Sequence, residues 1–428
     1  MLYSVVIHGA HVIAPGRDLG VADVRVEDGR IAAVGGADAA PRPGDEVIDA
    51  HGQTLIPGFV DIHSHGRGGF DFSDATDEAF DAIGRGKLAD GVTSFLATGL
   101  TLPEDSLAAL CHATERYKDR VAAGAADGAT CLGVHLEGPF FNPKMAGAQN
   151  PAYLRDPDAA LVMRLHAISP VRIVSLAPEL PGAEKCIREL TEAGIVVSGG
   201  HSEADYAAFE RARAAGMRHL THFCNALLPA HHLRPTMVNG GLIADDVRTE
   251  IICDGVHLSD AMIRLVAKAK GPDGVMLITD AMRAAAQPDG FYSLGGLRVR
   301  VEHGRATLAD VPYDPKAIVS NVAGSVALFP DCFRRWVRLC GFPLHEAIKA
   351  AGWNQLRSLG IRDRGDIAPG QRADLVLVDN HLAPQSVLVG GDKGRSHPSG
   401  LVRVVARGRK KPYTARPFPP APMHRFPE

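Results

Sequence analysis

Two kinds of hydrophobic pattern divide the chain. Short runs rich in β-branched residues, such as Ser4–Ile7, fill the first sixty residues, and similar runs return near the other end, as at Leu401–Val405. Turn residues separate these runs, including Asp28-Gly29, a pair that favours a tight hairpin. Because only the two ends of the chain share this pattern, we predict that they form one small β-sandwich domain together, from residues 1–57 and 365–410.

The middle of the chain alternates short apolar runs with stretches of helical composition such as Asp260–Lys270. Nearly continuous apolar strands are typical of a parallel sheet, because helices bury both of its faces. Eight strand–helix units are the number needed for a (β/α)8 barrel, which we predict over residues 58–364. The eight runs are Ile56–Ile62, Thr93–Ala97, Leu132–Leu136, Ile173–Leu176, Ile195–Ser198, His219–Phe223, Glu250–Cys253 and Met276–Thr279.

Composition excludes several classes of protein. The chain of 428 residues is 46% hydrophobic, enough for a full core, and its net charge of −3 gives no argument for nucleic-acid binding. No apolar run is long enough for a membrane span, and the N-terminus lacks the basic region of a secretory signal. The seven cysteines are scattered, as in proteins with reduced thiols, so we expect a cytoplasmic protein. Residues 411–428 contain six prolines and are expected to form a tail outside both domains.

Polar residues follow the predicted barrel strands with unusual regularity. His63 and His65 follow the first strand, Glu137 ends the third, and further histidines and an aspartate follow later ones: His201, His222, His257 and Asp280. In a (β/α)8 barrel these strand ends meet at one face, where active sites are built. An open sheet would spread the same groups along a line, so this convergence favours the closed barrel.

The histidines and Glu137 have the composition of a metal centre. His63 and His65 are two apart on a strand, so both rings point the same way and can reach one ion. Imidazole suits zinc and similar divalent metals, and the Glu137 carboxylate could bridge two ions. His201 and His222 would add nitrogen ligands from neighbouring strands.

Asp280 ends an apolar strand, where a carboxylate needs a partner. Beside a metal-bound water it would act as a general base, although it could also cap a helix beginning at Ala281. His257 is open to two interpretations as well, orienting a substrate or capping the helix that begins at Asp260. The chain has no nucleotide-binding glycine motif and no GxSxG sequence, which argues against phosphotransferases and serine hydrolases.

The segment Pro57–His65 resembles the opening motif of the amidohydrolase superfamily. Further motifs resemble one of its branches, the N-acetylglucosamine-6-phosphate deacetylases, and the resemblance extends from about Leu2 to Val405. These motifs are Gly133–Pro139, Leu176–Glu179, Ser198–Ser202, Thr221–Ala226, Asp254–His257, Thr279–Ala281 and Ala323–Ser325.

The resemblance implies a role for each matching residue. Glu137, His201 and His222 would bind one metal ion, His63 and His65 would complete a second site, and Asp280 would be the catalytic acid/base. It also implies a homodimer in which a residue of one subunit completes the neighbouring site. The residues expected to contact the substrate are Ala148, Gln149, Asn225, Ala226, Arg234, His257, Val322, Ala323, Gly324 and Ser325.

Two positions depart from the pattern of the family. Gln149 stands where the family usually has a histidine that helps hold the substrate carbonyl, and an amide cannot carry a positive charge. Leu233 stands where the family tends to have the arginine that grips the phosphate, and Arg234 follows one residue later.

The sequence therefore predicts a metal-dependent deacetylase that hydrolyses the N-acetyl amide of an amino sugar to the free amine and acetate. N-acetylglucosamine 6-phosphate is the leading substrate, with one or two divalent ions, zinc first and iron, manganese or cobalt also open. Two alternatives stay open: an amidohydrolase for a non-phosphorylated N-acetylhexosamine, an N-acyl amino acid or a cyclic amide, and a catalytically silent barrel that serves as a scaffold.

Overall fold

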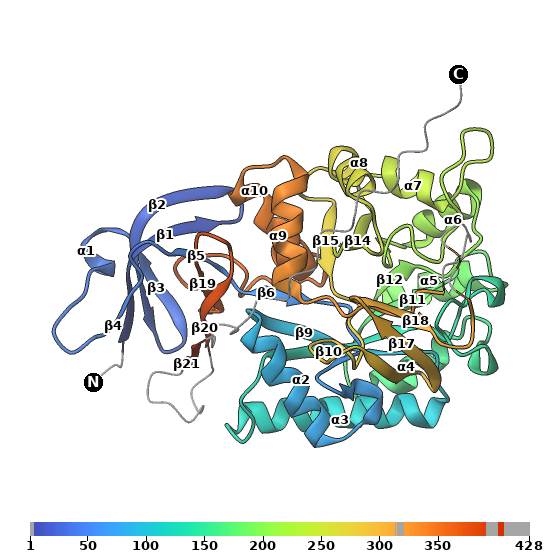
Figure 1. The fold of residues 1–428 in the computed structure, drawn as a ribbon, viewed down its shortest axis with the longest axis horizontal. Coiled ribbons are helices and arrows are strands. Elements are labelled where there is room, and N and C mark those ends of the chain that lie inside the picture. Colours follow the sequence, from blue (N-terminus) through green and yellow to red (C-terminus); the bar gives the residue numbers. More distant parts are fainter. Residues whose placement is uncertain (1–3, 313, 315–320, 391–400, 406–428) are drawn as a thin grey trace.

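The structure is a computed structural model that describes residues 4–312, 314, 321–390 and 401–405 (Figure 1). The predicted Pro-rich tail, residues 411–428, lies outside the described residues. Among the helices of the described ranges, none combines the length and the apolarity that crossing a lipid bilayer requires.

The predicted barrel is confirmed: eight parallel strands follow one another in chain order around one sheet. Each strand overlaps the apolar run predicted for it. The sixth strand is shorter than its run, because the chain leaves the sheet after Leu220 and turns at His222, where φ is 27°. The strands are β6 (Phe59–Asp61), β9 (Val92–Gly99), β10 (Thr130–Glu137), β11 (Val171–Leu176), β12 (Val196–Gly199), β13 (His219–Leu220), β14 (Arg248–Ile252) and β15 (Val275–Ile278).

The first and last strands meet at their carboxyl ends. The backbone N–H of Asp280 donates to the carbonyl of His63 over 2.9 Å. Below this contact the buried Asp61 carboxylate accepts hydrogen bonds from the Thr279 hydroxyl at 2.7 Å and from Lys87 Nζ at 2.8 Å. This buried ion pair joins the first strand, the last strand and the helix that holds Lys87, so it fixes the place from which Asp280 projects.

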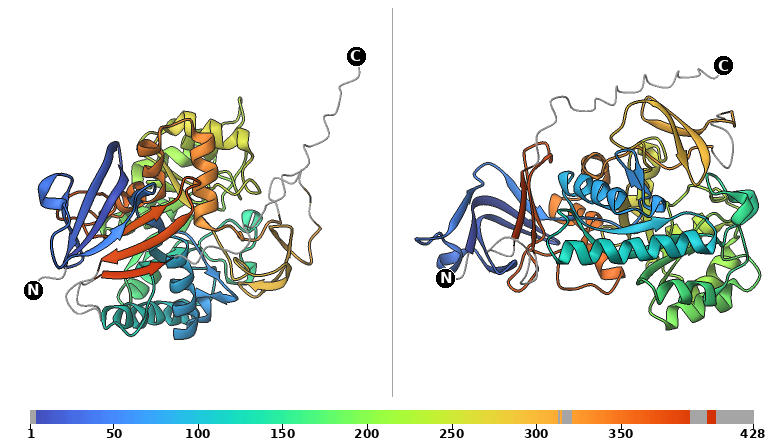
Figure 2. Two further views of the ribbon diagram at one scale, coloured as in Figure 1. Left: turned by 60° about the vertical axis from the view of Figure 1, so that its left-hand side comes forward. Right: turned by 90° about the horizontal axis from the view of Figure 1, so that it is seen from below.

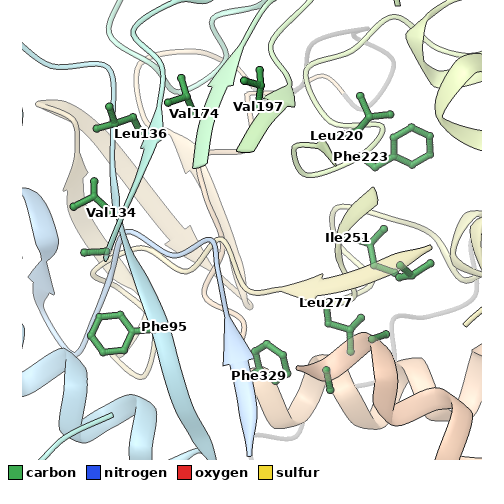
Figure 3. Packing of buried hydrophobic residues seen from close by; sticks show 14 of the residues in the cluster. Phe95, Val134, Leu136, Val174, Val197, Leu220, Phe223, Ile251, Leu277 and Phe329 are labelled. Atoms are coloured by element: carbon green, nitrogen blue, oxygen red, sulfur yellow. The ribbon is translucent and has the colours of Figure 1, made fainter. Parts of the chain in front are cut away.

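Successive side chains of the barrel strands point to opposite sides. On β14, Ile251 packs in the outer layer while Ile252 packs inside the barrel; on β15 the same holds for Leu277 and Met276. This two-residue period explains the continuous apolar runs, because the barrel interior and the helix layer are both apolar. Figure 3 shows part of the outer layer, with Phe95, Val134, Leu136, Val174, Val197, Leu220, Phe223, Ile251, Leu277 and Phe329.

A helix of between 7 and 19 residues follows each barrel strand and covers the outside. Side-chain caps begin several of them: Thr76, Asp205 and Ser259 each accept a backbone N–H of the first turn. The helix predicted at Asp260–Lys270 is observed with the same bounds. The helices are α2 (Asp77–Ala89), α3 (Glu104–Ala122), α4 (Ala159–His166), α5 (Ala183–Glu192), α6 (Tyr206–Ala215), α7 (Met237–Ile243), α8 (Asp260–Lys270) and α9 (Phe329–Cys340).

Both ends of the chain form the second sheet, as predicted, and in Figure 1 its blue and red strands lie side by side. The hairpin predicted at Asp28-Gly29 joins β2 to β3, and both turn residues have positive φ. The strand β20 was not predicted. The strands are β1 (Ser4–Ala14), β2 (Arg17–Glu27), β3 (Arg30–Val34), β4 (Glu46–Asp49), β5 (Thr54–Pro57), β19 (Leu375–Val378), β20 (Pro384–Gly390) and β21 (Leu401–Val405).

A three-stranded antiparallel sheet, also not predicted, is inserted between β15 and α9 (Figure 2). It contains β16 (Gly290–Leu294), β17 (Leu297–Glu302) and β18 (Arg305–Leu308). Leu294 and Val299 pack with Leu100 and Met282 in a small apolar cluster of their own. Since Met282 directly follows Asp280-Ala281, this insertion covers the end of β15 and one side of the site described next.

Candidate metal centre and substrate pocket

Three predicted ligands converge at the carboxyl ends of β10, β12 and β13. Oε1 of Glu137 lies 3.2 Å from Nε2 of His201 and 3.0 Å from Nε2 of His222, and the two Nε2 atoms are 3.0 Å apart. All three side chains are buried. Three donor atoms this close to one another suit a single ion with bonds of about 2.0–2.2 Å.

A second group lies beside the first and contains the other predicted ligands. Nε2 of His65 is 3.1 Å from Oδ1 of Asp280 and 3.2 Å from Oε2 of Glu137. Nε2 of His63 is 3.5 Å from Asp280 Oδ1 and 3.5 Å from Glu137 Oε1. Glu137 therefore stands between two groups of potential ligands, His201 with His222 on one side and His63, His65 and Asp280 on the other.

The donor chemistry fits divalent ions. His63 Nε2 is buried and has no hydrogen-bond partner among the described residues, and Asp280 Oδ1 lies between it and His65 Nε2, at 3.5 Å and 3.1 Å. His201 donates its Nδ1–H to the Met145 carbonyl at 2.8 Å, since a carbonyl only accepts, which leaves the lone pair on Nε2. Such a hydrogen bond on the far nitrogen is how metal-binding histidines are usually held.

The carboxylates of the centre stabilise the protonated, positively charged form of the neighbouring histidine His65. Burial lowers the pKa of His65, but Asp280 and Glu137 outweigh it and raise the pKa to about 10. Burial raises the pKa of Glu137, yet His63, His201 and His222 outweigh it and hold that pKa well below its usual range. An assembly of fixed carboxylates that attracts protons so strongly is equally suited to attract a divalent cation.

Three residues of the centre adopt backbone conformations that are uncommon outside glycine. The φ angles are 47° at His201, 27° at His222 and 49° at Asp280. Strained backbone of this kind costs about 1–3 kcal/mol per residue and concentrates at functional sites. At Asp280 the conformation is held by the Ser325 N–H, which donates to the Asp280 carbonyl at 2.7 Å.

A pocket of about 60 Å³ opens onto the centre. Most of the predicted substrate contacts line it, together with three residues that the sequence did not single out, Leu100, Gly147 and Leu294. The predicted residues on its wall are His65, Glu137, Ala148, Gln149, His201, His222, Asn225, Ala226, His257, Asp280, Val322 and Gly324.

Three predicted contacts lie off the pocket wall. Ala323 is fully buried in the apolar cluster of the inserted sheet, and Ser325 hydrogen-bonds the backbone on both sides of Asp280. Arg234 lies on an exposed loop beside Leu233, which is 76% exposed. In one copy of the chain, then, Arg234 is not among the residues around the pocket.

Gln149 reaches the metal centre through its side-chain amide. Its Oε1 accepts the backbone N–H of Thr101 at 2.8 Å, which orients the amide so that Nε2 donates to Oε2 of Glu137 at 2.6 Å. The residue that departs from the family pattern thus contacts a predicted ligand directly, while still lining the pocket.

His257 is oriented by Asp254. The Asp254 carboxylate accepts from His257 Nδ1 at 2.8 Å and from the backbone N–H groups of Val256 and His257. Burial lowers the pKa of His257, but the Asp254 carboxylate outweighs it and raises the pKa above its ordinary value. When protonated, a ring held at Nδ1 by Asp254 has a second hydrogen, on Nε2, that it can donate, and His257 lines the pocket.

Two buried residues beneath the centre, Glu250 and His135, were not among the predicted site residues. Glu250 Oε2 lies 3.0 Å from Nδ1 of His63. His135 donates Nδ1–H to the carbonyl of Ile62 and accepts at Nε2 from the Ser175 hydroxyl. The available signal was an acid at the start of the apolar run Glu250–Cys253, a position where burial demands a partner.

The model of the amidohydrolase family matches residues 54–403. The chain therefore belongs to this family, as its motifs predicted. Within it the chain belongs with the N-acetylglucosamine-6-phosphate deacetylases: the enzyme of that name from Lysinibacillus sphaericus is 34% identical over 391 residues, 91% of this chain and 97% of the relative.

Two further comparisons bear on the pocket. The N-acetylgalactosamine-6-phosphate deacetylase of Escherichia coli O157:H7 is 34% identical over 86% of this chain and 93% of its own length. A variant of the Mycobacterium smegmatis N-acetyl-D-glucosamine-6-phosphate deacetylase, solved in complex with N-acetyl-D-glucosamine-6-phosphate, superposes with a TM-score of 0.80 at 34% identity, over 90% of this chain and 97% of that one.

Proposed function

We propose that this protein is a metal-dependent deacetylase that converts N-acetylglucosamine 6-phosphate to glucosamine 6-phosphate and acetate. The observation that carries the proposal is the convergence of Glu137, His201 and His222 within 3.2 Å of one another, facing a pocket that Asp280 also lines. The relatives' names and the sugar phosphate bound to the Mycobacterium smegmatis enzyme support the substrate.

The proposed metal ligands are Glu137, His201 and His222 for one ion, and His63 and His65 with Asp280 for a second. Zinc suits this set of imidazoles and carboxylates, and iron, manganese or cobalt would also bind. A divalent ion in this position lowers the pKa of water and polarises the amide carbonyl.

Asp280 is the proposed catalytic acid/base. Burial raises the pKa of its carboxyl, but His65 and His63 outweigh it and hold the pKa below its ordinary value, so Oδ1 is free to accept a proton. It takes the proton from the attacking water and returns it to the departing amine. His257, held by Asp254, donates from Nε2 to an oxygen of the substrate and so orients it.

Phosphate recognition is proposed to require a second copy of the chain. Arg234 lies off the pocket and on an exposed loop, next to the exposed apolar side chain of Leu233. A homodimer that covers this loop would bury Leu233 and bring Arg234 to a neighbouring pocket. We propose such a dimer, in the cytoplasm, where a phosphorylated sugar is available.

The test is a substrate panel with acetate release as the readout. The purified protein is stripped with a chelator and reloaded with Zn²⁺, then given N-acetylglucosamine 6-phosphate, N-acetylgalactosamine 6-phosphate, the two free sugars and N-acetylated amino acids. We expect hydrolysis that depends on the metal and is fastest with a 6-phosphate. Preference for a free sugar or an N-acyl amino acid would favour the alternative amidohydrolase. No bound metal and no hydrolysis of any compound would favour the silent scaffold.

A further inference from the structure

Glu250 is a carboxylate placed where a carboxylate is costly. It lies in the middle of β14, points into the barrel beneath the metal centre, and is 0% exposed. Burying an acid in a barrel interior is unfavourable unless strong hydrogen bonds compensate. Its contacts therefore deserve a functional explanation beyond packing.

Those contacts go to histidine ligands on either side of Glu137. Glu250 Oε2 is 3.0 Å from Nδ1 of His63 and 3.4 Å from the backbone N of His222. When His63 is neutral it can carry only one ring proton, and the carboxylate, which only accepts, places that proton on Nδ1. The lone pair of His63 is then on Nε2.

Nε2 of His63 is aimed at the centre and has nothing else to bind. It is buried without a hydrogen-bond partner among the described residues and lies 3.5 Å from both Glu137 Oε1 and Asp280 Oδ1. With Nδ1 held by Glu250, the ring presents one free nitrogen to the position between His65, Asp280 and Glu137.

A different use of the same residues is excluded by their hydrogen bonds. His63, His135 and Glu250 also lie close enough to share an ion. However, His135 donates from Nδ1 to Ile62 and accepts at Nε2 from Ser175, so neither of its nitrogens is available. Glu250 therefore serves His63 rather than a third metal site.

We propose that Glu250 is a positioning residue that converts His63 into a metal ligand and thereby determines whether a second ion binds beside the one held by Glu137, His201 and His222. Carboxylate partners of ligating histidines are worth about 10- to 100-fold in metal affinity. The inference rests on the proposed function only in that divalent ions bind here; it predicts metal affinities, which are measured without any turnover.

The experiment titrates Zn²⁺ and Co²⁺ into the metal-free, full-length protein and measures bound stoichiometry, affinity and the visible absorption of Co²⁺. The variants are E250L, which removes the acceptor, and E250Q, whose amide oxygen still accepts from Nδ1–H but carries no charge. The affinity for the ion held by Glu137, His201 and His222 serves as the internal control, because Glu250 is not expected to change it. The wild type should bind two ions per chain, and in E250L one of the two should bind about 10- to 100-fold more weakly, while E250Q should lie between them.

A double-mutant cycle separates positioning from general structural damage. If Glu250 acts through His63, then E250Q should not weaken the second ion further once H63A is present, because the acceptor has no ring left to hold. If E250L does not unfold cooperatively, the comparison of E250Q with and without H63A decides. Wild-type affinities for both ions in E250Q and E250L, a single ion in the wild type, or a full effect of E250Q in the H63A background would each overturn the proposal. Failure of the proposed function would look different: no acetate release by a wild type that still binds its metal.

Discussion

Replacing Asp280 by asparagine tests the chemistry at a single atom. Asn has the same shape and tolerates the left-handed backbone found here, where φ is 49°. It still reaches His65, whose Nε2 lies 3.1 Å from Oδ1, but it cannot take up a proton. Loss of a general acid/base costs about 10²–10⁴-fold in rate, which corresponds to about 2.7–5.4 kcal/mol of transition-state stabilisation. We expect D280N to lose that much kcat, with a much smaller change in KM.

The assay follows acetate release from N-acetylglucosamine 6-phosphate with metal content measured on the same sample. A matched control is D28N, the same substitution at an exposed hairpin residue whose φ is 48°, which should leave kcat and metal content unchanged. D280N should keep the ion held by Glu137, His201 and His222. A D280N protein with wild-type kcat would refute the acid/base role. Loss of the ion held by Glu137, His201 and His222 would show that the substitution disrupts the whole centre rather than proton transfer alone.

Three other substitutions test neighbouring parts of the account. K87M leaves the Asp61 carboxylate buried without its cation, so the free energy of unfolding in urea should fall by about 3–5 kcal/mol. A loss below about 1 kcal/mol would show that the pair contributes no more to stability than an exposed ion pair does. D254N removes the anion that raises the pKa of His257 while burial continues to lower it. His257 then loses its proton at lower pH, and the alkaline fall of the kcat/KM profile should move to lower pH; an unmoved profile would exclude protonated His257 from the reaction. Q149L removes the donor to Glu137 Oε2 and should cost about 1–3 kcal/mol of stability and weaken retention of the first metal in a chelator competition; unchanged stability and metal retention would show that the contact is dispensable.

The barrel could be predicted because the pattern that indicates it, a short apolar strand followed by a helix, is local in the sequence and recurs eight times. A strand buried on both faces must be apolar throughout, as Ile251 and Ile252 illustrate by packing on opposite sides of β14. The range predicted for helix α8 matches its observed bounds, where Ser259 caps the first turn and Gly271 follows the last residue. The convergence of the candidate ligands could be predicted for a related reason: in a barrel the carboxyl ends of the strands share one face, so a polar residue there is brought near the others.

The parts that could not be predicted depend on contacts between distant segments. Glu250 and His63 are 187 positions apart, and nothing in the local pattern around either residue indicates that they touch. The direction of the Gln149 amide is set by the Thr101 backbone, 48 positions away. Strands β16–β18 form a short insertion beside the pocket, and in β17 buried residues alternate with exposed ones, a pattern that the barrel strands do not have.

The most direct test of the account is anomalous diffraction at the zinc edge from crystals of the zinc-loaded protein. We expect a peak about 2.0–2.2 Å from Glu137 Oε1, His201 Nε2 and His222 Nε2. Crystals of zinc-loaded protein with no peak between these three side chains, or with zinc bound only elsewhere, would contradict it.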